Sequence, residues 1–521
     1  MKPVRMLSGI LTVSSWTLLS RILGFIRDVL IAGLIGPGPL MDAFVAAFRL
    51  PNMFRRFFAE GAFNAAFVPM FSKKLETGKD AAEFASLALS CLSIAVLILT
   101  GMAMVFMPAL VWLTAEGFHG DRRFDLTVEF GRIVFPYIIF ISLAALFSGV
   151  LNAAGRFAAA AAAPVLLNVM LVAAMSAAWA TGHDVSLALV WTIPFAGVAQ
   201  LVLVWHAAGR AGIRIRPARP RWTSDISRLI KIAIPAALAG GVVQVNLLVG
   251  QIVASYYDNA ISWLYTADRL YQLPLGVIGI AVGVVLLPTL SSRLAAGDEA
   301  GGREAFSRAG EIALALTIPA SVALLAIPYP LVSVLFERGA FTEEDSAATA
   351  LAVSIYGIGL PAFVLQKILQ PVFFARENTT DPFRYALAAM FINAVIAAGL
   401  AIYIGWIATA IATTISAWSM VWLLFRGARN KYGTAASFNQ RFVSRTFRVM
   451  IASVILGGFL FFLAQILEPY LDISGWRWML LAFIVLCGTI CYLGIGIALK
   501  AFKISEIRQM LKRKAKLDTG K

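Results

Sequence analysis

Long runs of apolar residues recur along almost the whole chain, separated by short polar segments. Fourteen windows reach the roughly 20 apolar residues that an α-helix needs to cross the hydrocarbon core of a membrane. They lie at residues 6–34, 40–71, 84–111, 127–152, 160–181, 186–208, 226–254, 258–290, 309–336, 346–375, 383–404, 406–426, 447–467 and 476–500. The pattern predicts an all-α integral membrane protein of about fourteen transmembrane helices.

Four of these windows are unusually long and are interrupted by glycine, proline or charged residues. They are the windows at 6–34, 40–71, 258–290 and 346–375. Such interruptions are typical of tilted or broken transmembrane helices.

Composition supports a membrane protein and excludes several other classes. Of the 521 residues, 60% are hydrophobic and 14% are charged, whereas a soluble protein carries about 25% charged residues. Most helices must therefore face lipid. The three cysteines lie in apolar runs without metal-ligand spacing, and the three histidines are scattered singly, so we predict no metal site and no catalytic histidine.

The basic residues predict the orientation in the membrane. An even number of spans puts both termini on one side, and most of the 44 Lys and Arg residues fall in the tails and loops of that side. The opposite loops hold only Arg122, Arg123, Arg338 and Arg477. By the positive-inside rule both termini are cytoplasmic. The net charge of +16 thus needs no nucleic-acid partner, and we expect the basic C-terminal tail to contact anionic lipids.

An internal repeat relates the two halves of the chain. The segment from Phe48 to Gly78 is similar to the segment from Asp268 to Gly297, and Arg49 and Arg269 are 220 residues apart. Nearly the same offset relates Tyr137 to Tyr356, Arg156 to Arg376, and Glu116-Gly117-Phe118 to the stretch from Glu337 to Phe341.

The repeat predicts the domain organisation. The offset spans six helices, and an even number of helices preserves orientation, so the repeats are parallel. We predict an N-lobe at 1–222, a C-lobe at 223–430, and a C-terminal helix pair with a basic cytoplasmic tail at 431–521. Two such lobes with a cavity between them are typical of transporters.

Eleven ionisable residues lie at membrane depth in the windows at 6–34, 40–71, 258–290 and 346–375, where each costs roughly 2.5 to 3.5 kcal/mol. They are Arg21, Arg27, Asp28, Asp42, Arg49, Arg55, Arg56, Glu60, Asp268, Arg269 and Lys367. Seven are basic and four are acidic, so ion pairing alone leaves a surplus of positive charge. The spacing of seven places Asp42, Arg49 and Arg56 on one helical face. A water-filled cavity that binds an anion explains this pattern, and salt bridges bracing the lobes are the alternative.

The choice of arginine indicates the kind of anion. The planar guanidinium makes paired hydrogen bonds to phosphate oxygens and stays charged when it is poorly hydrated. The pattern therefore favours a lipid substrate with a phosphate or pyrophosphate headgroup.

Several motifs resemble those of the MurJ (MviN) family of bacterial lipid II flippases. They are Ser20–Asp28 (SRILGFIRD), Arg49–Arg56 (RLPNMFRR), Phe58–Phe63 (FAEGAF), Ala267–Leu270 (ADRL) and Pro274–Val277 (PLGV). The resemblance covers essentially the whole chain, including the last two helices.

The resemblance implies a fold and a function. The family belongs to the multidrug/oligosaccharidyl-lipid/polysaccharide exporter superfamily and resides in the bacterial inner membrane. Its members move undecaprenyl-pyrophosphate-linked peptidoglycan precursor, lipid II, from the cytoplasmic to the periplasmic leaflet by alternating access. The implied partners are lipid II, membrane lipids and the cell wall synthesis machinery, and no cofactor is implied. A coupling cation or the membrane potential is the implied energy source.

The resemblance also implies roles for individual residues. The residues expected to bind the pyrophosphate are Arg21, Arg27, Arg55 and Arg269. The residues expected in supporting or gating roles are Asp28, Asp42, Arg49, Arg56, Glu60 and Asp268. The last two helices are expected to form a groove for the lipid tail. Many relatives have an acidic residue where this chain has Gln272, so the role of that carboxylate is not carried over.

Two other functions are compatible with parts of the pattern. A related exporter of drugs is disfavoured by the basic surplus, but an exporter of another polyprenyl-linked glycan would need the same arginines. A membrane enzyme acting on isoprenyl phosphates would need clustered carboxylates for a metal, or a positioned base. The apolar windows contain no such cluster.

Overall fold

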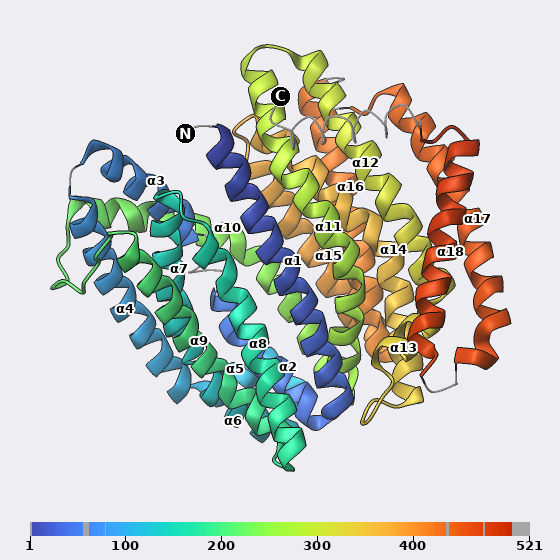
Figure 1. Ribbon diagram of the computed structural model, residues 1–521, viewed down its shortest axis with the longest axis horizontal. Coiled ribbons are helices and arrows are strands. Elements are labelled where there is room, and N and C mark those ends of the chain that lie inside the picture. Colours follow the sequence, from blue (N-terminus) through green and yellow to red (C-terminus); the bar gives the residue numbers. More distant parts are fainter. Residues whose placement is uncertain (1–2, 56–61, 79, 434–436, 472–474, 503–521) are drawn as a thin grey trace. The chain divides into compact units, whose positions relative to one another are not determined.

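The computed structural model describes residues 3–55, 62–78, 80–433, 437–471 and 475–502, and every regular element in these ranges is a helix (Figure 1). The helices of the first half are α1 Pro3–Leu34, α2 Pro39–Arg55, α3 Ala62–Thr77, α4 Ala81–Val105, α5 Met107–Thr114, η2 Glu116–Phe118, α6 Arg122–Val134, α7 Tyr137–Ala153, α8 Ala158–Thr181 and α9 Val185–Arg210. Those of the second half are α10 Ser224–Ser255, α11 Ala260–Ala295, α12 Glu299–Ala326, α13 Pro328–Phe336, α14 Glu343–Phe374, α15 Thr380–Ile404, η3 Gly405–Ile407, α16 Ala408–Tyr432, α17 Gln440–Leu471 and α18 Arg477–Ala498. The predicted site residues Arg56 and Glu60, and nearly all of the basic tail, lie outside the described residues.

Each of the fourteen predicted windows contains one or two of these helices, which confirms the all-α fold. Three of the four windows expected to contain tilted or broken helices hold a single continuous helix, namely α1, α11 and α14. α11 continues through both Pro274 and Pro288. A proline removes only one hydrogen bond from the ladder, and neighbouring groups in a helical bundle can compensate for it.

Breaks occur at other places, and proline accounts for them. α4 ends just before Phe106, and α5 starts at Met107, one residue before Pro108. α12 ends at Ala326, and α13 starts at Pro328 after the single residue Ile327. Proline fits the first turn of a helix, where its missing N–H has no partner to lose. Each of these windows therefore contains a long helix followed by a short one.

The helix bounds repeat along the chain. α1 and α10 are both 32 residues long, and the distance along the sequence is 221 residues from Pro3 to Ser224 and from Leu34 to Ser255. The pair α6 and α7, which runs from Arg122 to Ala153, is related to α14 by the same 221 residues at both ends. The structure thus confirms the internal repeat that the sequence motifs predicted.

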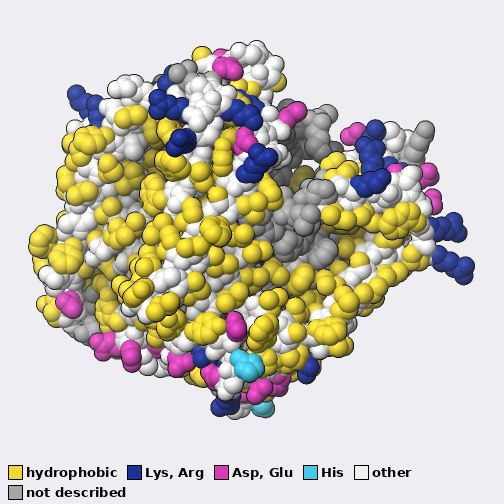
Figure 2. Space-filling view, turned by 180° about the vertical axis from the view of Figure 1, so that it is seen from behind, with side chains coloured by type: hydrophobic (Ala, Val, Ile, Leu, Met, Phe, Trp, Pro, Cys, Tyr) yellow, Lys and Arg dark blue, Asp and Glu magenta, His cyan; other side chains and the backbone are white. Residues whose placement is uncertain are grey.

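The helices have the surfaces of membrane-spanning segments. Nine helical stretches within the described residues are long and apolar enough to cross a membrane, and the one at Thr380–Tyr432 contains both α15 and α16. Large hydrophobic side chains are exposed on them, such as Trp205 on α9 and Phe462 on α17. Figure 2 shows hydrophobic side chains over the helix surfaces and charged ones near the helix ends. These surfaces are suited to contact with lipid.

The chain divides into two compact units. The first comprises Met1–Ser262 with Arg338–Thr342, and the second comprises Trp263–Glu337 with Glu343–Lys521. The first unit includes α10, because this helix packs on α3 and on η2. The first unit thus extends to Ser262, whereas the N-lobe predicted from the repeat ends at residue 222. The lobe boundary stays a prediction.

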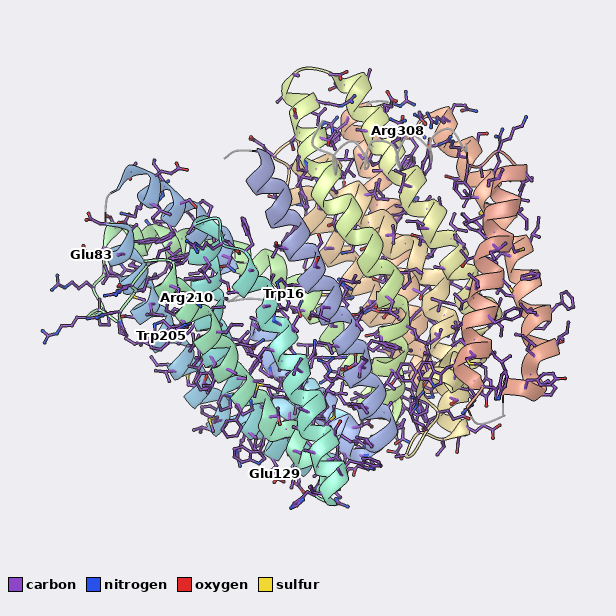
Figure 3. All side chains as sticks on the ribbon, in the orientation of Figure 1. Trp16, Glu83, Glu129, Trp205, Arg210 and Arg308 are labelled. Carbon is purple, nitrogen blue, oxygen red and sulfur yellow. The ribbon has the colours of Figure 1, made fainter. Side chains whose placement is uncertain are left out.

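The first unit is built from paired helices. α1 packs beside α8, α2 beside α6, and α7 beside α9. Its core contains a stack of aromatic rings in which Phe67 contacts Phe63, Phe71 and Phe84. Figure 3 places Glu83 on α4 and Glu129 on α6 at opposite ends of this unit, with Trp205 between them. Charges at the ends and aromatic residues along the sides are typical of a transmembrane bundle.

In the second unit α14 packs beside both α12 and α16, and α15 packs beside α16. The C-terminal helices α17 and α18 lie side by side (Figure 1), and α17 packs on α12. An ion pair attaches this pair to the rest of the unit, because Arg445 on α17 contacts buried Glu311 on α12 at 2.9 Å. At the other end Arg477 on α18 contacts Glu337 at 3.0 Å.

Candidate functional site

One face of α1 forms a polar contact with α8. Arg27, a predicted pyrophosphate ligand, has a half-buried side chain whose Nη1 donates to Oδ1 of Asn168 at 2.9 Å. Its Nε and Nη2 donate to Oδ1 of the neighbouring Asp28 at 3.0 and 2.7 Å. Asp28 is 5% exposed. The structure thus brings together Arg27 and the predicted supporting residue Asp28, and it adds Asn168, which the sequence analysis missed.

Arg21 lies on the same helix in an exposed position. It precedes Asp28 by seven residues, so the two share a face of α1. Arg21 therefore presents its charge on the same side of the helix as the carboxylate that contacts Arg27.

The predicted arginines of α2 contact nearby polar groups. Arg55, at the end of α2, donates from Nε to Oδ1 of Asn52 at 3.3 Å. Arg49 donates from Nη1 to the carbonyl oxygen of Leu247 on α10 at 3.3 Å. Asn52 itself donates to the carbonyl oxygen of Phe48, which keeps its Oδ1 turned toward Arg55.

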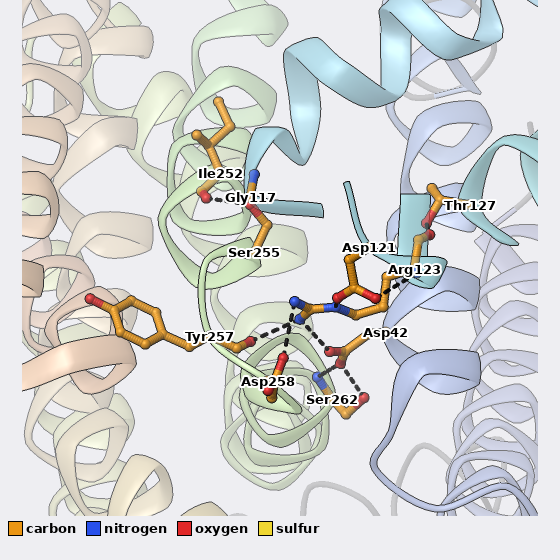
Figure 4. A network of polar contacts seen from close by, with 10 residues as sticks. All are labelled: Asp42, Gly117, Asp121, Arg123, Thr127, Ile252, Ser255, Tyr257, Asp258 and Ser262. Atoms are coloured by element: carbon orange, nitrogen blue, oxygen red, sulfur yellow. Dashed lines mark hydrogen bonds and ion pairs between the residues drawn. The ribbon is translucent and has the colours of Figure 1, made fainter. Parts of the chain in front are cut away.

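Asp42 belongs to a separate buried cluster, shown in Figure 4. Its side chain is 0% exposed and lies in the first turn of α2. Oδ1 accepts hydrogen bonds from both the backbone N–H and the hydroxyl of Ser262, at the start of α11. Oδ2 faces Arg123 at 3.7 Å. These contacts hold α2, α6 and the start of α11 together, which gives the predicted supporting residue Asp42 a structural role.

Arg123 is the centre of this cluster, and the sequence analysis placed it in a loop, whereas the structure places it in a helix. It lies in the first turn of α6, with a side chain that is 7% exposed. Besides Asp42 it contacts Asp121 and Asp258, the latter at 3.0 Å. Its guanidinium also lies over the ring of Phe118. Because α6 packs against α2, a residue that looks like a loop arginine in the sequence becomes buried.

Asp121 both caps α6 and contacts the Arg123 side chain. Asp121 accepts a hydrogen bond from the backbone N–H of Arg123, as an N-cap residue does. Burial acts to raise the pKa of the Asp121 carboxyl, but hydrogen bonds and the charge of Arg123 outweigh it and hold the pKa below its ordinary value. Asp121 is therefore ionised at neutral pH.

A close backbone contact lies beside this cluster. The N–H of Gly117 in η2 donates to Oγ of Ser255 at the end of α10, at 3.0 Å. A Cβ at Gly117 would collide with the backbone of Ser255 and Tyr256. Only glycine lets η2 approach α10 this closely.

The predicted residues of the second unit lie on α11. The guanidinium of Arg269 lies 4.2 Å from the centre of the Tyr265 ring, one helical turn earlier. Asp268 and Gln272 are half-buried on the same helix. Tyr271 packs between Tyr356 and Phe363 of α14, with ring centres 5.1 and 5.2 Å away. The aromatic side chains around Arg269 favour a poorly hydrated guanidinium.

The described residues contain no group of three or more His, Cys, Asp or Glu side chains that could hold a metal ion. The three cysteines are half-buried and are not paired in disulfides.

Comparison with known proteins finds a matching family model and similar curated proteins. The family model described as "Lipid II flippase MurJ" matches residues 31–481. A probable lipid II flippase MurJ of Rhizobium tropici is 40% identical over 97% of this chain and 96% of its own length. A second, from Rhizobium meliloti (strain 1021), is 41% identical with the same coverage.

Solved structures agree with this comparison. A lipid II flippase MurJ in an inward closed conformation has a TM-score of 0.78 at 25% identity, covering 94% of this chain and 98% of that one. An inward-facing MATE family multidrug resistance transporter of the MOP superfamily has a TM-score of 0.65 at 14% identity, covering 80% of this chain and 97% of that one. The second match shows that the fold is shared with other transporters.

Proposed function

The chain belongs to the lipid II flippase MurJ family, and from this premise we propose that it moves lipid II from the cytoplasmic to the periplasmic leaflet for peptidoglycan synthesis. The observation that carries the proposal is the match to two curated relatives over 97% of the chain at 40% and 41% identity. In this proposal the protein acts as a transporter and makes and breaks no bond in its substrate.

The physical need for such a protein lies in the headgroup of lipid II. Its sugar, peptide and phosphate groups would lose their hydrogen bonds to water in hydrocarbon, and each unsatisfied group costs several kcal/mol. A path lined by polar and charged side chains replaces those bonds. Alternating access then exposes that path first to one leaflet and then to the other.

We propose that Arg21, Arg27, Arg55 and Arg269 bind the pyrophosphate. Guanidinium groups bind phosphate oxygens through paired, charge-assisted hydrogen bonds. Support for this assignment comes from the basic surplus in the apolar windows and from the half-buried positions of Arg27, Arg55 and Arg269. The proposed supporting residues are Asp28, Asp42, Arg49, Arg56, Glu60 and Asp268.

The proposed energy source is the membrane potential or a coupled cation. In this proposal the anionic headgroup moves outward, a direction that an inside-negative potential favours by about 2.3 kcal/mol per charge per 100 mV. The proposed surroundings are membrane lipids, including anionic headgroups near the basic tail, and the cell wall synthesis machinery of the bacterial inner membrane.

Depletion of the protein in its own cells tests the function. We expect lipid II to accumulate, and the fraction that a hydrolase can cleave from outside spheroplasts to fall. If lipid II remains fully accessible while another polyprenyl-linked glycan accumulates, this protein exports that glycan instead.

Alanine substitution tests the four arginines. Each of the variants Arg21→Ala, Arg27→Ala, Arg55→Ala and Arg269→Ala should fail to support growth of the depleted strain at normal protein levels, because a pyrophosphate contact is lost. Arg210→Ala and Arg308→Ala are matched controls, because both arginines are exposed (labelled in Figure 3). Growth with all four variants would refute the assignment.

A further inference from the structure

Asn168 is a buried polar residue in a helix that is otherwise almost entirely apolar. α8 begins with a run of alanines and contains one asparagine, which is 6% exposed. A buried amide must find hydrogen-bond partners, because leaving it without them costs roughly 1 to 3 kcal/mol. The partners of Asn168 on both sides of its amide lie on α1.

The two ends of the amide bind different groups of α1. Nδ2 donates to the carbonyl oxygen of Ser20 at 3.0 Å and lies 3.4 Å from its hydroxyl. Oδ1 accepts from Nη1 of Arg27 at 2.9 Å. The backbone of α1 thus fixes the amide, and the amide in turn fixes the guanidinium.

The sequence of α1 permits this contact. Ser20, Gly24 and Arg27 are spaced by four and three residues, so they lie on one face of the helix. Gly24 has no side chain on that face, and the amide nitrogen of Asn168 lies 3.5 Å from the position that a Cβ would take. Asn168 therefore reaches past Gly24 to both Ser20 and Arg27.

We infer that Asn168 is a positioning residue that holds the Arg27 guanidinium in the orientation in which it binds the pyrophosphate of the lipid substrate. The inference rests on the proposed function. Asp28 holds Nε and Nη2 of Arg27, and Asn168 holds Nη1, so the planar group cannot rotate. An amide does this without adding negative charge, whereas a second carboxylate would weaken the attraction of Arg27 for an anion.

The test measures the affinity of the purified full-length protein in nanodiscs for lipid II. We compare the unaltered protein with Arg27→Ala, Asn168→Ala, Asn168→Asp and the double variant Arg27→Ala/Asn168→Ala. Asn168→Ala should weaken binding about tenfold, the loss expected for one hydrogen bond to a charged group. Because Asn168 acts through Arg27, the double variant should bind within about twofold of Arg27→Ala.

Asn168→Asp separates positioning from packing. Aspartate has nearly the same shape and keeps an acceptor for Arg27, but it loses the Nδ2 donor to the carbonyl oxygen of Ser20, so the thermal unfolding midpoint should fall although no cavity forms. Affinity for lipid II should fall at least as far as in Asn168→Ala, because the added charge opposes the anion. If Asn168→Ala does not fold, Asn168→Asp and its double variant with Arg27→Ala complete the cycle.

Gln200 supplies the matched control. It is a buried amide of α9 that accepts from the Tyr137 hydroxyl and donates to the carbonyl oxygen of Ala163 on α8, with no arginine among these partners. Gln200→Ala should lower the unfolding midpoint while leaving the affinity for lipid II within about twofold.

The outcomes distinguish the inference from the proposed function. If Arg27→Ala weakens binding and Asn168→Ala does not, the inference is overturned and the pyrophosphate assignment stands. Additive losses in the double variant also overturn it, because Asn168 would then act independently of Arg27. If Arg27→Ala leaves binding unchanged, the assignment of Arg27 fails and the role of Asn168 fails with it.

Discussion

Equivalent positions of the two repeats carry contacts of different chemistry. Asp42 is the fourth residue of α2 and faces Arg123 in the first turn of α6. Trp263 is the fourth residue of α11, and its indole N–H donates to Asp345 in the first turn of α14 at 2.8 Å. Within its own unit each contact joins the starts of corresponding helices.

The difference lies in the electrostatics of the two contacts. In the first unit one arginine is surrounded by Asp42, Asp121 and Asp258, so its loss leaves several carboxylates without their cation. In the second unit a neutral donor meets one carboxylate, and the Trp263 ring also packs on Trp406 at 5.1 Å. The repeat therefore preserves the position of the contact, but the residues that form it differ between the two halves.

The largest expected effect is that of Arg123→Ala. Removing one partner of a buried ion pair typically destabilises a protein by about 3 to 5 kcal/mol, and Asp42 has no exposure to water that could replace the arginine. Thermal unfolding in detergent should show a much lower midpoint. The control is Arg122→Ala, because this neighbouring side chain is exposed. Equal midpoints for the two variants would mean that the buried contacts of Arg123 do not stabilise the fold.

A smaller effect is expected for Trp263→Phe. Phenylalanine keeps an aromatic ring against Trp406 but loses the hydrogen bond to the Asp345 carboxylate, a loss of about 1.5 to 3 kcal/mol. The same unfolding measurement should show a modest decrease in the midpoint. A decrease as large as that of Arg123→Ala would mean that the two contacts are energetically equivalent after all.

The smallest effect is a dependence on pH at Asp121, in the first contact. The pKa of Asp121 is lowered in the folded protein, so the stability that its ionised form contributes is present above the unfolded-state pKa and is lost as the pH falls through the folded-state pKa. Asp121→Asn should therefore unfold at a lower temperature than the unaltered protein at neutral pH. The difference should shrink on acidification to the folded-state pKa, and a constant difference would exclude this carboxylate as the source.

Much of the fold could be predicted from the sequence because the membrane leaves few choices. Apolar windows must be helical in lipid, where backbone groups need internal partners, and the motifs around Arg49 and Arg269 indicated the repeat. Helix continuity was harder to predict. α11 passes two prolines without a break, while α4 ends near Pro108, and the outcome depends on packing around each proline.

The candidate site could be predicted in part. Intramembrane charge identifies Arg27 and Asp28 in the sequence, since such charges rarely lack a function. Asn168 carries a weaker signal, because it is only a single amide in an alanine-rich helix. Which residues of α1 it meets depends on how α8 packs on α1, and the sequence of α8 does not determine that. Arg123 was missed for the same reason, because a charged residue at a helix start is normally exposed and only the packing of α6 on α2 buries it.

The absent side chain of Gly117 has a consequence for how this region tolerates change. In a saturation library scored for growth, alanine, the smallest replacement, should already be depleted at position 117, since its methyl group has nowhere to go. The neighbouring Glu116 has an exposed side chain and should accept many residues. A large difference in tolerance to substitution between positions 116 and 117 would thus show, in living cells, how closely the two backbones pack.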